Sequence, residues 1–167
     1  TTLMNERLAI GGGISTGFPE IKALAEALPF ASGQAIDDPA VRSKLADWYA
    51  KSAGLKNTGA RAMSALSKGE VPGPENSIGK LVAGGMMQDI AKFALDLQGL
   101  GGLITDPEIA RSQAQIQAML MRSPAVRIEG GTDQILRNII AERVLGLPED
   151  MRADKGLAFN QIPTGNS

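Results

Sequence analysis

The feature that most constrains the fold is a stripe of apolar and small side chains that recurs every four and three positions from Val41 to Leu66. This spacing follows the 3.6-residue turn of an α-helix, so all members of the stripe lie on one face. The stripe consists of Val41, Leu45, Trp48, Ser52, Leu55, Gly59, Ala62 and Leu66. It predicts one continuous helix of about seven turns, and its small residues at 52, 59 and 62 would allow a neighbouring helix to approach closely.

Proline, glycine and aspartate indicate where the helices of the N-terminal part begin and end. A first helix is expected from about Leu3, weakening at the glycines of positions 11–13. A short helix is expected from Pro19, and Pro29 ends it. The run Asp37-Asp38-Pro39 starts the striped helix, because a carboxylate can cap it and proline fits its first position.

The segment after the turn at residues 69–74 predicts a helix that is apolar on two sides. One side carries Ile78, Leu81, Val82, Met86, Ile90, Phe93 and Leu97, and the other carries Met87, Ala91 and Leu95. A two-sided pattern is typical of a helix at the centre of a bundle or of one that faces another subunit. Both readings remain open, and the second predicts that subunits associate through this helix.

Two further helices are expected in the C-terminal part. A glycine-rich loop from Gly99 to Asp106 precedes a shorter helix that starts at Pro107 and stops at Pro124. Its apolar face carries Ile109, Ile116 and Leu120, and its glutamines lie on the other face. The last helix opens at Thr132 and ends at the cap Gly146-Leu147-Pro148. Its apolar set is Ile135, Leu136, Ile139, Ile140 and Val144.

Strand-like alternation is nearly absent, and Ala, Leu, Gln, Lys and Arg dominate the long segments, which predicts an all-α protein. Short loops between antiparallel helices predict an up-and-down four-helix bundle with an additional short helix over residues 1–149. Residues 150–167 are polar and aperiodic, and we expect a poorly ordered tail. The 167 residues suit one domain. Because the chain starts without Met and enters a helical pattern almost at once, we expect it to be part of a longer protein.

The composition excludes several classes of function. Histidine and cysteine are absent, which excludes Ser–His and Cys–His nucleophiles, disulfides and thiolate zinc sites, and no metal site is expected. Acid–base chemistry must then use carboxylates, Lys or Tyr, or a cofactor. The formal net charge of −1 argues against a nucleic-acid or anionic-membrane surface. No apolar run is long enough for a membrane span.

The glycine runs at 11–13, 84–85, 99–102 and 130–131 do not follow a strand, and none matches a phosphate-binding fingerprint. Thr132 is most simply a helix cap, and Glu6-Arg7 is most simply a solvated pair. The residues alone therefore predict a helical bundle with a candidate site at the start of its last helix. They do not name a reaction.

The closing stretch IEGGTDQILRNIIAERVLGLP closely resembles the C-terminal signature of acyl-CoA dehydrogenases, in which a Gly-Thr pair precedes a helix of the type (S/A/D)-(E/Q)-I-x-R-x-x-I-A. Four earlier segments are similar to motifs of that family's C-terminal domain, in the same order: LMNERLAIGGG, LADWYAKSAGLKNTGARAM, PGPENSIGKL and LDLQGLGGL. The resemblance covers the whole chain. It implies the third, helical domain of a three-domain protein that binds FAD between its domains.

The resemblance implies α,β-dehydrogenation of an acyl-CoA thioester, with FAD as the cofactor. Medium-chain and short-chain members use a Glu directly before the Gly-Thr pair as the base, but that position is Gly130 here and Glu129 stands one residue too early. Long-chain and isovaleryl members place the base on the first helix of this domain, in a Glu-Arg-Leu context that Glu6 matches. Glu6 is therefore the implied catalytic base.

The resemblance also assigns binding residues. Arg7 would lie beside the substrate, and Gly130 and Gly131 would bind it, with the amide of Gly130 donating to the thioester carbonyl. Thr132 and Gln134 would contact the flavin. The loop residues Gln98, Gly101 and Gly102 would reach the adenosine of a neighbouring subunit's FAD.

One departure from the family pattern keeps an alternative open. The family usually carries Arg-x-x-Phe-Gly after the first helix, and this arginine meets the FAD pyrophosphate of a neighbour. The corresponding region reads PFASGQAIDDPAVRSKLADW, without that arginine, and Arg42 stands at a different spacing. Some members pair a catalytic subunit with a degenerate one, so the alternative is the domain of a non-catalytic assembly subunit. An unrelated helical interaction module is the third reading.

The partners implied by the resemblance are the acyl-CoA substrate, an electron-transferring flavoprotein as electron acceptor, and the other subunits of a homo- or hetero-tetramer. The implied location is the bacterial cytoplasm or, as a second option, the mitochondrial matrix.

Overall fold

The computed structural model describes residues 16–30, 33–70, 73–149, 154 and 156–162. The α-helices in this part are α2 (Phe18–Ala27), α3 (Pro39–Ser67), α4 (Asn76–Leu97), α5 (Gln115–Val126) and α6 (Asp133–Arg143). The 3-10 helices are η1 (Ala35–Asp37), η2 (Gly99–Leu103), η3 (Arg111–Ala114) and η4 (Phe159–Gln161). The only strands among the described residues, β1 (Pro29–Phe30) and β2 (Gly33–Gln34), form one short antiparallel pair. The predicted all-α fold is therefore confirmed.

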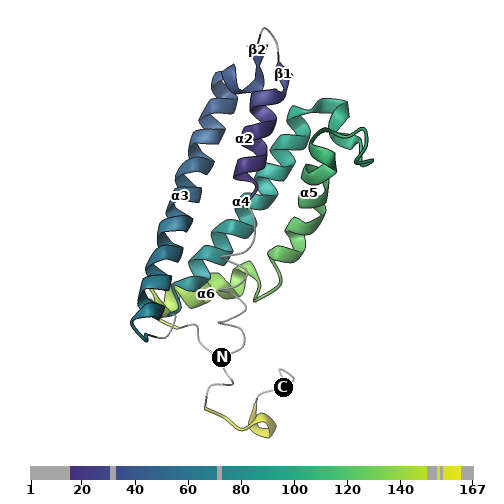
Figure 1. The fold of residues 1–167 in the computed structure, drawn as a ribbon. Coiled ribbons are helices and arrows are strands. Elements are labelled where there is room, and N and C mark those ends of the chain that lie inside the picture. Colours follow the sequence, from purple (N-terminus) through teal and green to yellow (C-terminus); the bar gives the residue numbers. More distant parts are fainter. Residues whose placement is uncertain (1–15, 31–32, 71–72, 150–153, 155, 163–167) are drawn as a thin grey trace.

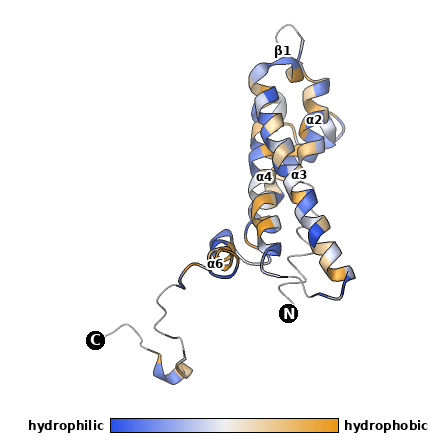
Figure 2. Ribbon diagram, turned by 90° about the vertical axis from the view of Figure 1, so that its left-hand side faces the viewer, coloured by the Kyte–Doolittle hydropathy of each residue, from blue (hydrophilic) through white to orange (hydrophobic). Residues whose placement is uncertain are grey.

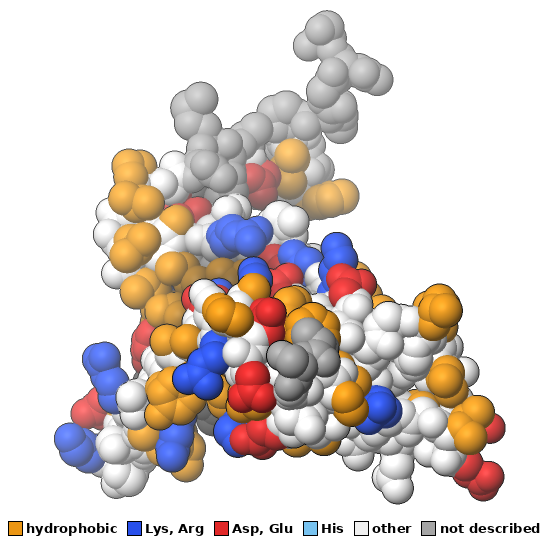
Figure 3. Space-filling view, turned by 90° about the horizontal axis from the view of Figure 1, so that it is seen from above, with side chains coloured by type: hydrophobic (Ala, Val, Ile, Leu, Met, Phe, Trp, Pro, Cys, Tyr) orange, Lys and Arg blue, Asp and Glu red, His pale blue; other side chains and the backbone are white. Residues whose placement is uncertain are grey.

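The helices form a bundle around α4. In Figure 1, α3, α4 and α5 run side by side, α2 lies against the upper part of α3 and α4, and α6 lies across the lower end. Apolar residues line α4 and α6 where the two helices meet at that lower end (Figure 2). Seen from above, cationic and anionic side chains are interspersed, and neither sign of charge dominates that face (Figure 3). No helix in the described ranges is both long and apolar enough to cross a membrane.

The start of α3 follows the predicted local chemistry. Asp38 caps the helix, because its Oδ1 accepts hydrogen bonds from the N–H groups of Ala40, at 2.8 Å, and Val41, at 3.1 Å. The first residues of the predicted stripe, Val41, Leu45 and Trp48, are buried. Further along, Gly59 is exposed, and no described atom lies within 4 Å of the place where a Cβ would stand. The expected close approach of a second helix therefore has no partner at Gly59 among the described residues.

Both apolar sides of α4 are buried by the chain itself. Met86 and Ile90 from the first predicted side, and Met87 and Ala91 from the second, are all 7% exposed or less. Helices α2, α3, α5 and α6 all pack against α4. The structure therefore confirms the central helix, and association of subunits through this helix stays a prediction.

The connection between α4 and α5 differs from the prediction. The predicted start at Pro107 is wrong: Asp106 caps only one turn, with its Oδ1 accepting from the Glu108 N–H at 2.9 Å. The chain then passes through left-handed conformations at residues 112–114, whose φ angles are 53°, 51° and 58°. Such angles interrupt a right-handed helix, so α5 begins only at Gln115. Ile109, predicted on the buried face, lies before the helix and is 71% exposed.

The predicted stop at Pro124 is also wrong, because α5 continues to Val126. Proline lacks the N–H that would bond to the carbonyl four residues earlier. Here the Ser123 hydroxyl donates to that carbonyl, on Leu120, at 2.8 Å. The neighbouring side chain thus replaces the missing hydrogen bond, and the helix completes its last turn.

The glutamines of α5 do not all lie on a polar face. Gln117 is 6% exposed, and its Nε2 donates to the backbone carbonyls of Gly102, at 3.2 Å, and Ile104, at 2.9 Å. These bonds tie the glycine-rich loop after α4 to α5. The loop also packs closely on α4, since a Cβ on Gly102 would lie 2.6 Å from the carbonyl oxygen of Leu95.

The last helix starts and ends where the sequence predicts. Thr132 is its N-cap, and Gly146, with a φ of 67°, follows its end. Of its apolar set, Leu136 is buried, whereas Ile135 is 50% and Val144 is 38% exposed. The predicted tail, residues 150–167, lies partly outside the described residues, as does the whole predicted first helix from Leu3 to residues 11–13.

We expect Gly102→Ala to destabilise the chain and Gly101→Ala to serve as its matched control. The new methyl group at 102 would force the loop away from Leu95, which should lower the free energy of unfolding by about 1–3 kcal/mol. At Gly101 nothing lies within 4 Å of an added Cβ, so a change within about 0.5 kcal/mol is expected. Urea unfolding followed by circular dichroism measures both. Equal stability of the two variants would contradict this packing.

Candidate functional site

A turn of two glycines leads into α6. Gly130 and Gly131 have φ angles of 64° and 104°, conformations that glycine adopts far more readily than other residues. Thr132 follows as N-cap, its Oγ1 accepting from the Ile135 N–H at 3.4 Å. Gly130 is buried and Gly131 half-buried. We name residues 130–132 the entrance turn.

A cluster of charged and polar side chains contacts the entrance turn and the first residue of α6. Lys80, from the first third of α4, is completely buried, and its Nζ donates to the carbonyl of Gly131 at 2.7 Å. The same Nζ lies 3.9 Å from Oδ1 of Asp133, whose side chain is 5% exposed. Arg127 donates from Nε to Oδ2 of Asp133 at 2.7 Å and from Nη1 to Gln88 Oε1 at 2.5 Å. Four side chains from α4, α6 and the end of α5 thus meet at one point, and we name them the entrance cluster.

No sequence motif indicated Lys80, Arg127 or Asp133 as site residues. A signal for Lys80 was present in the helical register, because positions 80, 83, 87, 90 and 94 share one face of α4, and the other four are buried apolar residues. A lysine on such a face must find partners inside the protein. Asp133 lies in the first turn of α6, where a carboxylate is favoured by the helix dipole.

Glu129 forms its ion pair outside the entrance cluster. Its Oε1 forms an ion pair with Nη2 of Arg122 at 2.6 Å, on the surface of α5. The carboxylate is therefore already paired with a cation on α5, the helix that precedes the entrance turn.

The residues predicted to reach a neighbour's FAD lie at the opposite end of α4. They are Gln98, Gly101 and Gly102. Gln98 follows α4 directly, and its Nε2 donates to the Ala94 carbonyl at 3.0 Å. Gly101 and Gly102 belong to η2, at the upper end of the bundle in Figure 1, whereas α6 lies at the lower end. The distance along α4 from Lys80 to Gln98 is roughly 27 Å, at 1.5 Å per residue.

The structure thus brings Gly130, Gly131, Thr132 and Gln134 together, with Gln134 exposed, and separates them from Gln98, Gly101 and Gly102. Glu6 and Arg7 lie outside the described residues.

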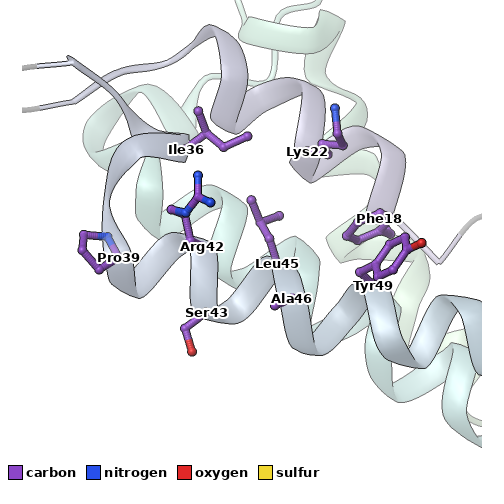
Figure 4. A pocket seen from close by; sticks show the side chains of 9 residues that line it. All are labelled: Phe18, Lys22, Ile36, Pro39, Arg42, Ser43, Leu45, Ala46 and Tyr49. Carbon is purple, nitrogen blue, oxygen red and sulfur yellow. The ribbon is translucent and has the colours of Figure 1, made fainter.

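Arg42 belongs to an open pocket between α2 and α3. The pocket has a volume of about 490 Å³, and Figure 4 shows the guanidinium of Arg42 beside Ile36, with Phe18 and Tyr49 at the far end. The two aromatic rings lie 5.9 Å apart, centre to centre. Lys22 also lines the pocket but pairs with Glu26 on its own helix. Arg42 has no ion pair with any residue in the described part of the chain.

The chain is similar to known proteins over most of its length. A family profile described as "Acyl-CoA dehydrogenase, C-terminal domain" matches residues 1–145. Acyl-CoA dehydrogenase IpdE1 of Mycolicibacterium smegmatis is 34% identical over 118 residues, which cover 71% of this chain and 28% of that protein. The chain therefore spans less than a third of the length of this relative.

Solved structures share the fold. The ChsE4–ChsE5 complex from Mycobacterium tuberculosis matches with a TM-score of 0.67 at 23% identity, over 83% of this chain and 37% of the matched chain. An acyl-CoA dehydrogenase from Geobacillus kaustophilus matches with a TM-score of 0.70 at 20% identity, over 84% of this chain and 36% of that one. Since the family profile covers residues 1–145, the chain belongs to the acyl-CoA dehydrogenase family, of which it contains the C-terminal helical domain.

Proposed function

We propose that this chain is the C-terminal domain of an FAD-dependent acyl-CoA dehydrogenase, which introduces a double bond between Cα and Cβ of an acyl-CoA thioester. The observation that carries the proposal is the entrance turn, where two glycines with positive φ are held at the start of α6 by a buried lysine. Backbone amides at the N-terminus of a helix are suited to stabilise an oxygen on which negative charge develops.

The described residues fit FAD at both ends of α4. In the entrance turn, the Thr132 hydroxyl accepts one long bond, and its own proton remains for donation to the flavin. At the upper end, Gln98 Oε1 is buried without a hydrogen bond to any described residue. Such an acceptor suits a hydroxyl of the adenosine ribose. Gly101 and Gly102 place backbone beside it without side chains.

In the proposed reaction, the Glu6 carboxylate removes the proton from Cα of the substrate. The bond electrons form the new Cα–Cβ double bond as a hydride leaves Cβ, and FAD, when bound, supplies the acceptor for that hydride. The N–H of Gly130 donates to the thioester oxygen, which lowers the cost of removing the α-proton. Arg7 is assigned to substrate binding, and Thr132 and Gln134 would hold the flavin.

The separation of the two groups supports the proposed roles of different FAD molecules. With roughly 27 Å of helix between them, the entrance turn serves the flavin of its own subunit, while Gln98, Gly101 and Gly102 contact the adenosine of a neighbour's FAD. We therefore propose a homo- or hetero-tetramer in which neighbouring subunits share FAD sites. Exposed apolar residues near the end of α6, including Leu145 at 66% and Leu147 at 53%, support further contacts that the described residues do not supply.

The full-length protein would pass its electrons to an electron-transferring flavoprotein, in the bacterial cytoplasm. The alternative function is that of a non-catalytic assembly subunit. Two observations favour it: the family's Arg-x-x-Phe-Gly motif has no counterpart here, and one structural neighbour is named as a complex of two components, ChsE4 and ChsE5.

The catalytic role is tested by two single variants of the full-length protein. Glu6→Gln should slow the bleaching of the flavin by substrate, measured without oxygen, by about a hundred- to ten-thousand-fold, because it keeps shape but removes basicity. Flavin should remain bound. Glu129→Gln is the matched control and should react at nearly the wild-type rate, since the carboxylate of Glu129 is paired with Arg122. The opposite pattern, with Glu129→Gln inactive and Glu6→Gln active, would refute the assignment of the base.

The choice between the two functions is tested by flavin content. The full-length protein, purified alone, should retain FAD and be reduced by acyl-CoA. The control is the same protein purified with the protein encoded beside it. A chain that is colourless alone and carries flavin only with its partner would favour the assembly subunit.

A further inference from the structure

Lys80 is the one lysine of the described chain that is fully buried. Burial of an ammonium group costs several kcal/mol unless hydrogen bonds and an opposite charge compensate it. The Lys80 Nζ donates to the carbonyl of Gly131 at 2.7 Å, whereas it lies 3.9 Å from the Asp133 carboxylate. A side chain of α4 thus binds a backbone oxygen that lies 51 positions further along the chain.

The carbonyl that Lys80 binds belongs to the most adaptable part of the site. Gly130 and Gly131 lack Cβ atoms, and each can adopt many backbone conformations in addition to the observed φ angles of 64° and 104°. The Gly131 carbonyl shares a planar peptide with the Thr132 N–H, so rotation of this peptide would turn that amide and alter the path of the backbone to Gly130. Because Lys80 extends from α4, its Nζ fixes that peptide to the helix that α2, α3, α5 and α6 all contact.

The remaining members of the entrance cluster hold the other side of the same turn. Arg127 donates from Nε to Oδ2 of Asp133, and the N–H of Asp133 donates to the Arg127 carbonyl at 3.2 Å. Asp133 Oδ1 is buried and accepts no hydrogen bond from the described residues, so the charge of Lys80 compensates it at 3.9 Å. The two contacts fix the residues on either side of the Thr132 cap.

We propose that Lys80 is a positioning residue of the dehydrogenase site: its bond to the Gly131 carbonyl orients the amides of the entrance turn that bind the substrate thioester. This inference rests on the proposed function. It assigns to a residue of α4, far from the turn in sequence, the task of holding the oxyanion-binding backbone in its reactive geometry.

The test uses the full-length flavoprotein with Lys80→Met, which keeps the length and removes the charge and the donor. Lys80→Arg retains both, and Lys92→Met is the control, since Lys92 is an exposed lysine of the same helix. Displacement of an amide that stabilises developing negative charge raises mainly the energy of the transition state. Lys80→Met should therefore slow anaerobic flavin reduction by about tenfold to a hundredfold, with much smaller changes in substrate affinity and flavin content. Lys80→Arg should recover part of the rate, and Lys92→Met should match the wild type.

Amide hydrogen exchange provides a second readout that does not depend on catalysis. Peptides covering residues 128–136 should exchange faster in Lys80→Met than in the wild type, while those from α3 and α5 remain unchanged. If the wild-type protein dehydrogenates no acyl-CoA, the proposed function fails, and this exchange still decides whether Lys80 holds the turn. If the wild type is active but Lys80→Met has normal exchange and a normal rate, the inference about Lys80 is refuted and the function stands.

Should Lys80→Met not fold, Lys80→Gln decides the question. Glutamine is one bond shorter than lysine, so its uncharged donor stops short of the Gly131 oxygen. Faster exchange of the turn together with slower reduction supports the inference. A folded Lys80→Gln variant that retains the wild-type reduction rate overturns it.

Discussion

The packing of four other helices against α4 is the constraint on which the rest of the structure depends. Helices α2, α3, α5 and α6 contact this helix, and small residues such as Ala83, Ala91 and Ala94 allow their close approach. A helix with four packed neighbours cannot rotate or slide without disrupting their contacts. Its two ends are therefore fixed points, one beside the entrance turn and the other beside the glycine-rich loop. Both candidate sites are built on these fixed points.

Local chemistry explains which parts of the fold could be predicted from the sequence. The caps at Asp38 and Thr132 and the stop at Gly146 depend on neighbouring residues only, and all three are found where expected. The predictions at Pro107 and Pro124 were wrong because they considered the proline alone. A proline shows only which hydrogen bond its own backbone cannot make. At Pro124, the Ser123 hydroxyl supplies the missing hydrogen bond. After Pro107, the left-handed residues 112–114 prevent the first turn from continuing into α5.

The candidate site was only half visible in the sequence. The entrance turn has a short, continuous signature, and its resemblance to a known family identified it. The entrance cluster draws Lys80, Arg127 and Asp133 from separate segments, so no local pattern joins them. A lysine is usually exposed, and only its position among buried residues of α4 distinguishes Lys80. The distance between Lys80 and Gly131 depends on the packing of α6 across the end of the bundle, which no periodicity specifies.

The length of α4 also explains how related subunits could share one fold and differ in function. Under the proposed function, the lower end of the bundle serves the chain's own flavin and the upper end serves a neighbour's. Roughly 27 Å of helix separates them, and the hydrogen bonds of the two ends share no side chain: Lys80 and Arg127 act at one, Gln98 and Gln117 at the other. Substitutions at sites so far apart are expected to act independently. Under the proposed function, a subunit can therefore lose residues that contact a neighbour's FAD, such as the arginine of the Arg-x-x-Phe-Gly motif, and still contribute to its own flavin site.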